Sequence, residues 1–521
     1  MATSEAAESA IPPTAESGQL HRKSLGVPDI VFFIVAAAAP LTAVAGGQAV
    51  SYLVTGNQAI PFFYLPFAII LILFVLGYAA MSRHVANAGA FYSYVARGMS
   101  RVGGVGTAFV AFISYNAMQV GIYGLFGVAF GAFMADKAGI TMDWYWWCFI
   151  AWGIIALLGV LQIDLNAKVL AVLLCLEILV VFLYDVAIAA DPGPGGITLT
   201  GFDPSIAFAG AVGASLAFVM AAFTGFESAA LYSEEAKDPK RTVARATFIG
   251  VGIVAGFYAI SSWLLGISVG PEVITDPAAL VKGGFVGIDP KVPDPTTVLF
   301  ITGADRLGAF WGDAATLLFA TSLFAALISF HNAVARYTFA LGRERILPRV
   351  FDKVSARTGA PWVGSLTQTL IAFTVLLIFA VSNEDPILKL FTWFTNLGAT
   401  GVLLLLAVTS FAIVGFFRKH PEDQTDAGKI ATLWAPAIAG IALSVIFVVV
   451  LLNFNVLITS AQDAPTDKMS IILPAVLIGG GIIGIIYGLY LKSAKPEVYE
   501  WIGQGPRAEV HTASAHATAE D

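Results

Sequence analysis

The chain has 521 residues, of which 58% are hydrophobic and 12% are charged, and its formal net charge is −7. Soluble globular domains carry about 25% charged residues, so this composition excludes an ordinary soluble protein and indicates an all-α integral membrane protein. The charges form no basic face, so nucleic acid is not an expected partner. Cys148 and Cys175 lie inside apolar segments without metal-ligand spacing, so we expect no cofactor, metal site or disulfide framework.

Only the middle of the chain requires a packed fold. Residues 1–24 and 496–521 are polar, low-complexity segments, and we expect both to be cytoplasmic tails, the first of them disordered. Residues 25–495 are expected to form one domain of twelve transmembrane helices. Its apolar spans, each long enough to cross a bilayer, lie at 28–54, 59–81, 103–135, 144–163, 167–190, 205–232, 246–270, 307–339, 362–382, 386–417, 432–459 and 470–491.

The distribution of basic residues sets the orientation of these spans. An even number of spans puts both termini on one side of the membrane, and the side that holds more Lys and Arg is cytoplasmic. With the termini inside, only six of the 28 Lys and Arg residues fall outside, namely Lys137, Lys282, Lys291, Arg306, Lys389 and Lys468. We therefore expect a multi-pass protein of the cell membrane with both termini in the cytoplasm.

The first, third and tenth spans carry unusual residues at membrane depth. Pro40, which lacks a backbone N–H, interrupts the first span. Tyr115 and Asn116 lie in the third, where Asn116 is expected either to contact a solute or to form an interhelical hydrogen bond. Tyr115 and Trp393, in the tenth span, are candidate aromatic residues of a pocket or gate.

The fifth span contains an ionisable side chain near the middle of the bilayer. Glu177 follows the inner end of the span at Ala167 by ten residues. At ~1.5 Å per residue it lies about 15 Å deep in a hydrocarbon core of ~30 Å. An intramembrane carboxylate is costly and marks a functional site, with neutralisation by a neighbouring helix as the alternative.

The sixth span, 205–232, is interrupted in the same way as the first. Gly225 weakens the helix, and Glu227 places a second carboxylate at membrane depth. The two broken spans lie five helices apart. Because five is odd, a repeat of spans 1–5 in spans 6–10 must be inverted across the membrane, and in transporters of this kind the two broken helices meet at the substrate.

A break in a membrane helix leaves backbone N–H and C=O groups that need partners. A zwitterionic amino acid fits, because free N–H groups attract its carboxylate and free carbonyls attract its ammonium group. A plain proline kink is the alternative for one broken helix taken alone. The expected backbone clamp consists of Ala39, Pro40, Leu41, Thr42 and Ala43 with Phe223, Thr224, Gly225 and Phe226.

Two stretches resemble the amino acid-polyamine-organocation (APC) transporter superfamily. The segment 225–246, GFESAALYSEEAKDPKRTVARA, resembles the family pattern of a GFE or GFD break in the sixth helix before EE-x-K-[ND]-P-x-R. The segment 333–362, AVARYTFALGRERILPRVFDKVSARTGAPW, resembles the loop after the eighth helix. The resemblance covers roughly residues 24–495. It implies the inverted-repeat (5+5) fold of the bacterial leucine transporter with two added C-terminal helices.

The resemblance also bears on the two carboxylates. Family members place an acidic residue two positions after the glycine of the sixth helix, which implies proton coupling at Glu227; a structural hydrogen bond is the alternative. Many members carry a lysine nine residues after the basic residue that opens the fifth helix, and here Lys168 is followed at that distance by Glu177. The reversed charge predicts a protonatable carboxylate or an ion site at Glu177.

The expected function is secondary active import of amino acids by alternating access, coupled to protons. No phosphate-binding loop is present to use nucleotide, and no His and Asp constellation points to an enzyme. An amino acid/amine exchanger and a polyamine or ethanolamine importer remain alternatives within transport. A transporter-like nutrient sensor or a channel is the alternative from another class.

Overall fold

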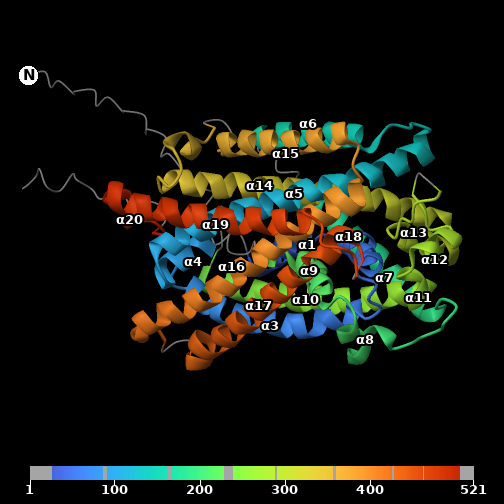
Figure 1. Ribbon diagram of the computed structural model, residues 1–521, viewed down its shortest axis with the longest axis horizontal. Coiled ribbons are helices and arrows are strands. Elements are labelled where there is room, and N and C mark those ends of the chain that lie inside the picture. Colours follow the sequence, from blue (N-terminus) through green and yellow to red (C-terminus); the bar gives the residue numbers. More distant parts are fainter. Residues whose placement is uncertain are drawn as a thin grey trace, which may run out of the picture.

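The computed structural model describes residues 26–85, 91–161, 167–227, 237, 239–287, 290–355, 359–424, 428–461 and 463–504. Over these residues the protein is a bundle of helices, and its long helices run roughly parallel to one another (Figure 1). Most of the two predicted tails, and residues 228–236 of the stretch 225–246 that resembles the APC pattern, lie outside the described residues.

Ten helices of the described chain are long and apolar enough to cross a membrane. They correspond to all of the expected spans except the first and the sixth. Two of them begin with a short π-helix, η5 before α16 and η7 before α17. The ten are α3 (Ile60–Ser82), α5 (Arg101–Ala138), α6 (Trp144–Leu161), α7 (Ala167–Ala190), α10 (Pro239–Val269), α14 (Ala309–Arg343), α15 (Trp362–Ser382), η5–α16 (Pro386–Phe391 and Thr392–Lys419), η7–α17 (Ile430–Trp434 and Ala435–Leu452) and α19 (Met469–Ala494).

The two remaining expected spans are divided into shorter pieces. The first consists of α1 (Val27–Ala38), the π-helix η1 (Thr42–Gln48) and α2 (Ala49–Thr55). The sixth begins with α8 (Pro204–Ala209) and α9 (Val212–Phe223), and α9 ends directly before Thr224 and Gly225. The predicted interruptions of these two helices are confirmed.

Short helices connect the long ones. The segment between α10 and α14 holds three of them, so it is more ordered than its Pro, Gly and Asp content suggests. The connecting helices are η2 (Thr200–Phe202), α4 (Phe91–Gly98), α11 (Pro271–Ile274), α12 (Pro277–Lys282), α13 (Thr297–Leu307), η4 (Arg349–Asp352), η6 (Pro421–Gln424), α18 (Phe454–Thr459) and α20 (Pro496–Trp501).

Local sequence signals set the ends of several helices. Ser100 caps α5 by accepting a hydrogen bond from the backbone N–H of Gly103 at 3.0 Å, and Gly139 ends the same helix in the left-handed conformation. Asp385 caps η5 by accepting from the N–H groups of Ile387 and Leu388. These caps satisfy backbone groups that the helix itself leaves without partners.

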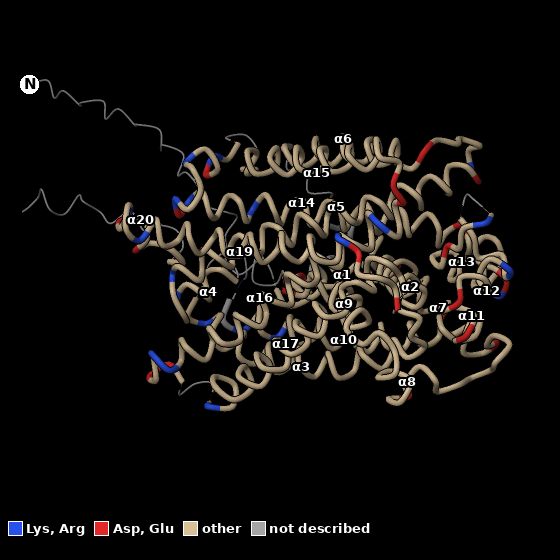
Figure 2. Tube along the Cα trace, in the orientation of Figure 1, with Lys and Arg blue, Asp and Glu red and all other residues tan. Residues whose placement is uncertain are grey.

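Charged residues gather at the two ends of the bundle, and few lie between them (Figure 2). This separation is the arrangement expected of helices that cross a bilayer, because a charge at membrane depth is costly. Among the ten spans, η5–α16 is the most buried, and it packs against α5, α4 and α17 at the centre of the bundle. The protein is a multi-pass membrane protein.

Helices α5 and α19 pack along a seam of small residues. A Cβ atom added to Gly484 would lie 2.8 Å from the carbonyl oxygen of Val105, and one added to Gly488 would lie 3.1 Å from the Cα atom of Val102. Contacts of this kind require glycine, and they let the two backbones approach closely in the way typical of membrane helices.

Candidate functional site

The break in the first helix lies between α1 and η1. Ala39 follows α1 with φ of 47°, a left-handed conformation that is uncommon for a residue with a side chain. Pro40 then removes one backbone donor. The carbonyl of Ala38 accepts a hydrogen bond of 2.8 Å from the hydroxyl of Tyr258 in α10. A neighbouring helix thus supplies a partner for the interrupted backbone.

The break in the sixth helix lies at the end of α9. Thr224 has ψ of 128°, and Gly225 follows with φ of 119°, so the chain leaves the helical path here. Glu227 is only 2% exposed, and one of its carboxylate oxygens, Oε2, accepts a hydrogen bond from the N–H of Gly225 at 2.9 Å. Its other oxygen, Oε1, accepts from the hydroxyl of Tyr115 in α5 at 3.1 Å.

A small cavity of about 60 Å³ lies between these two breaks. Since one water needs roughly 10–15 Å³, the cavity has room for a solute of only a few heavy atoms. Its lining is apolar apart from three threonines, and no described residue that lines it is charged. The lining residues are Ala38, Ala39, Thr42, Ala43, Gly47, Met118, Ile122, Phe218, Ala221, Ala222, Thr224, Ala326, Phe330, Phe391 and Thr395.

Four residues of the expected clamp line this cavity, namely Ala39, Thr42, Ala43 and Thr224. The other clamp residues lie beside it in the chain without lining it, and the aromatic ones pack into the core. Phe223 contacts Tyr64 and Phe67, with ring centroids 5.9 and 5.5 Å apart, and Phe226 contacts Phe74 at 6.2 Å. The clamp residues outside the lining are Pro40, Leu41, Phe223, Gly225 and Phe226.

The other predicted pocket residues lie outside the lining. Asn116 donates a hydrogen bond of 2.7 Å to the carbonyl of Phe112, one turn earlier in α5, and its Oδ1 is buried without a partner. Tyr115 bonds to Glu227 as described above. The indole ring of Trp393 lies under the ammonium group of Lys389, 5.7 Å from it.

Glu177 is connected to the cavity by a chain of hydroxyl groups. Its side chain is 4% exposed, and its Oε2 accepts a hydrogen bond of 2.7 Å from the Oγ of Ser322 in α14. Ser322 in turn accepts a hydrogen bond of 3.0 Å from Thr42, which lines the cavity. The backbone amide of Leu41 also interacts with the carboxylate. Glu177 of α7 therefore contacts both α14 and the break of the first helix.

Sequence reasoning missed the partners that other helices contribute. Ser322 and Tyr258 hold the first break, and Phe330 and Thr395 line the cavity. Serines, threonines and aromatic residues recur throughout the spans, so no local pattern distinguishes these four. Only the helix packing selects them.

Comparisons with known proteins agree with this architecture. The sequence profile of the amino acid permease family matches residues 25–483. The chain is 28% identical to human cationic amino acid transporter 4 over 240 residues, which cover 46% of this chain and 33% of that protein. It is 26% identical to the low-affinity putrescine importer PlaP of Escherichia coli over 220 residues, covering 41% and 44% of the two chains.

The chain thus spans less than half the length of these curated relatives. A crystal structure of the Eremococcus coleocola manganese transporter superposes with a TM-score of 0.54 at 17% identity, covering 94% of this chain and 99% of that chain. At this identity the match shows the shared fold alone. With the profile covering most of its length, the chain belongs to the amino acid permease family, a family of transporters and not of enzymes.

Proposed function

We propose that the protein imports small amino acids across the cell membrane by alternating access, as a secondary active transporter coupled to protons. The observation that carries this proposal is a cavity lined in part by both interrupted helices, with Thr42 belonging both to its lining and to the hydrogen-bond chain of Glu177. A solute in the cavity and a proton on the carboxylate would act on the same hydroxyl groups.

The interrupted backbone would bind the two groups that all α-amino acids share. At the start of η1, the amide of Leu41 interacts with Glu177 and that of Ala43 donates to the carbonyl of Ala39, so a substrate carboxylate would bind this N-terminal end beside these bonds or replace them. The end of α9 presents carbonyls that suit an ammonium group. In the conformation described here, the N–H of Gly225 donates a hydrogen bond to the carboxylate of Glu227. A substrate would have to bind beside that hydrogen bond or replace it.

Glu177 would couple transport to protons through its partners. An ionised carboxylate only accepts hydrogen bonds, whereas a protonated one can also donate. A change of protonation would therefore change which way the hydroxyl of Ser322 points, and with it the bond to Thr42. Glu227 is the second proposed proton-coupling residue, since it joins the other break to α5 through Tyr115.

The proposed topology has twelve spans in residues 25–495, with spans 1–5 and 6–10 as inverted repeats and the last two spans as accessories. Two breaks that lie five spans apart and meet at one cavity support the repeat. The excess of basic residues at one end supports cytoplasmic termini, with residues 1–24 and 496–521 as tails.

A small neutral amino acid is the favoured substrate class. A polyamine is longer than a small amino acid, and a cavity of about 60 Å³ has room for only a few heavy atoms. The described lining residues include three threonines and three phenylalanines. None of them is an acid that could pair with the second ammonium group of a polyamine. The names of the relatives, which refer to cationic amino acids and putrescine, make an amine importer or exchanger the second candidate.

The test is uptake of radiolabelled amino acids and polyamines into proteoliposomes without sodium, with and without an inward proton gradient. We expect the gradient to drive accumulation of a small neutral amino acid. Uptake that requires a counter-substrate inside would identify an exchanger. Strict dependence on sodium would contradict proton coupling, and binding without flux would favour the sensor.

A further inference from the structure

A third buried carboxylate lies in the outer half of α7. Asp185 follows Glu177 by eight residues, which at ~1.5 Å per residue places it about 12 Å further along the helix. The side chain is 7% exposed, and its Oδ2 accepts a hydrogen bond of 2.7 Å from the Oγ of Ser261 in α10. Its other oxygen, Oδ1, is buried and has no hydrogen-bond partner.

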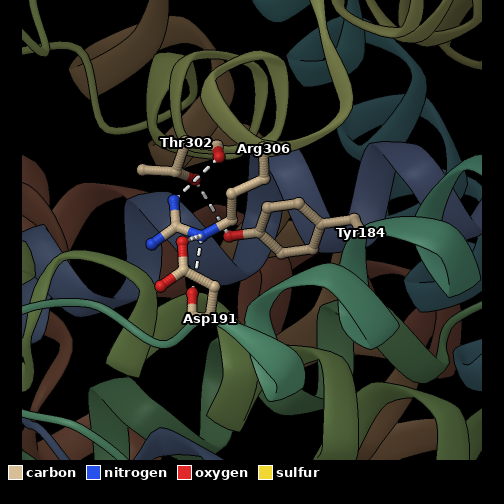
Figure 3. A network of polar contacts seen from close by, with 4 residues as sticks. All are labelled: Tyr184, Asp191, Thr302 and Arg306. Atoms are coloured by element: carbon tan, nitrogen blue, oxygen red, sulfur yellow. Dashed lines mark hydrogen bonds and ion pairs between the residues drawn. The ribbon is translucent and has the colours of Figure 1, made fainter.

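The guanidinium group of Arg306 is paired with groups other than Asp185. Arg306 of α13 donates from Nε to the backbone carbonyl of Asp191 at 2.6 Å and lies 3.4 Å from the carboxylate of the same residue. Its Nη1 donates to the carbonyl of Thr302 at 2.9 Å. Figure 3 shows this network, in which the hydroxyl of Tyr184 approaches Thr302 and the guanidinium group faces Asp191.

The other titratable groups near this level of α7 do not offer a positive charge. Tyr52 of α2 donates to the carbonyl of Ser262, and Tyr258 of α10 donates to Ala38. Asp305 of α13 and Asp313 of α14 are exposed acids. Among the described residues, no Lys, Arg or His forms an ion pair with Asp185.

An ionised carboxylate that is buried with one hydrogen bond and one oxygen without a partner is costly, because neither water nor a cation among the described residues stabilises its charge. Protonation removes the charge and keeps the bond to Ser261. We infer that Asp185 is a further proton-binding site of the transporter, separate from Glu177 and Glu227, and that its protonated form holds α7 to α10. Loss of the proton would favour separation of the two helices, because the charged group must then reach water.

This contact has a route to the substrate cavity. Ser261 lies one turn after Tyr258 in α10, and Tyr258 holds the carbonyl of Ala38 at the first break. A displacement of α10 at Ser261 would therefore move Tyr258 and alter its hydrogen bond to Ala38, which lines the cavity. The inference concerns proton binding and helix contact only, so it does not depend on which solute is carried.

Infrared difference spectroscopy in sodium-free lipid nanodiscs, without any substrate, tests the inference. A pH titration should reveal the carbonyl stretch of a protonated, buried carboxyl group. We expect this band to disappear in Asp185→Asn and to persist in Asp191→Asn, whose carboxylate is 78% exposed in the wild type. It should also persist in Glu177→Gln and in Glu227→Gln, which separates this site from the two proposed coupling sites. A spectrum of Asp185→Asn identical to that of the wild type would overturn the inference.

A second measurement distinguishes a proton from a metal cation. Thermal unfolding is compared in sodium chloride and in choline chloride. If Asp185 binds a proton, the unfolding midpoint of the wild type should be the same in the two salts. The unfolding midpoint of Asp185→Asn should likewise not depend on the salt. Stabilisation of the wild type by sodium that is absent in Asp185→Asn would instead identify a cation site and contradict the proposal.

If Asp185→Asn does not fold, Ser261→Ala tests the same proton-binding site. This variant keeps the carboxyl group and removes its hydrogen-bond donor. The band should then shift in frequency without being lost, because the carbonyl has one hydrogen bond fewer. A band that stays at the wild-type frequency would contradict the assigned contact.

Discussion

The break in the first helix and the break in the sixth obtain partners for their backbone groups from different sources. At the first break, the partners are side chains of other helices: Tyr258 of α10 donates to the carbonyl of Ala38, and the carboxylate of Glu177 in α7 interacts with the amide of Leu41. At the sixth, the carboxylate of Glu227 returns to the N–H of Gly225 within the same segment. Side chains of neighbouring helices therefore stabilise the first break, whereas a side chain of the same segment stabilises the sixth.

This difference suggests different tasks for the two acids that accompany the breaks. Glu227 stabilises a local turn and adds one contact to α5 through Tyr115. Glu177 belongs to α7 and reaches the first break through the amide of Leu41 and through Ser322 and Thr42, so it can respond to movement between helices. The following substitutions test this contrast.

Gly225→Ala should have the largest effect on stability. At φ of 119° a side chain is strained, and the cost of such a conformation is of order 1–3 kcal/mol. We expect a lower unfolding midpoint and at least a tenfold loss of uptake. Gly153→Ala in α6 is the matched control, since nothing lies within 4 Å of its added Cβ atom. Equal midpoints for the two variants would show that the sixth break needs no glycine.

Glu177→Gln should abolish proton-driven accumulation while leaving the fold intact. Glutamine keeps an acceptor for Ser322 but cannot exchange a proton. We expect at least a tenfold fall in gradient-driven uptake into proteoliposomes, with exchange of external for internal substrate retained. Accumulation at the wild-type level would remove Glu177 from the coupling mechanism.

Glu227→Ala should destabilise the protein more than Glu227→Gln. Alanine leaves the buried N–H of Gly225 without an acceptor, at a cost of about 1–3 kcal/mol, whereas the oxygen of glutamine can replace the lost acceptor. Thermal unfolding of the two variants measures the difference. If Glu227→Gln folds normally and still accumulates substrate with the proton gradient, the residue has only the structural role.

Thr42→Val should have a smaller effect on stability and a measurable one on coupling. A hydrogen bond between membrane helices contributes on average about 0.6 kcal/mol. The change removes the donor to Ser322 and retains the branched shape. We expect less accumulation per unit of proton gradient, read from the pH dependence of uptake. Thr400→Val is the control, because Thr400 donates only to its own helix at Asn396.

Ala39→Gly should have the smallest effect. Glycine removes the strain of the left-handed conformation but gains entropy in the unfolded chain, so we expect the free energy of unfolding to change by less than about 1 kcal/mol. Chemical denaturation in mixed micelles checks this. A large destabilisation would mean that the side chain of Ala39 contributes packing that its position beside the cavity does not indicate.

The sequence predicts the long helices and both interruptions because these depend on local composition. A run of apolar residues indicates a span, and Pro40 or Gly225 indicates a break, whatever the rest of the chain does. It also identifies Glu177 and Glu227, since charges inside apolar runs are rare. The shortened α9 and the three helices between α10 and α14 are less visible in composition.

The partners of these residues depend on which helices pack together, and composition does not contain that information. Nothing in the sequence around Ser322 shows that it contacts Glu177, because that contact exists only when α7 packs beside α14. Asp185 lies near the outer end of its span, where an acidic residue is easily assigned to the water interface, and only the packing of α10 shows that it is buried. Trp393 was expected at the pocket, whereas Phe391 and Thr395 of the same segment line the cavity.

The glycine seam between α5 and α19 has a practical consequence. Because the two backbones approach closely at Gly484 and Gly488, we expect the two helices to move together. Helix α5 carries Tyr115, the partner of Glu227, and α19 ends at Ala494 near the surface. A fluorescent label near that end of α19 would therefore report the movement of α5, a helix buried in the bundle. Single-molecule experiments could then follow this buried helix from the surface.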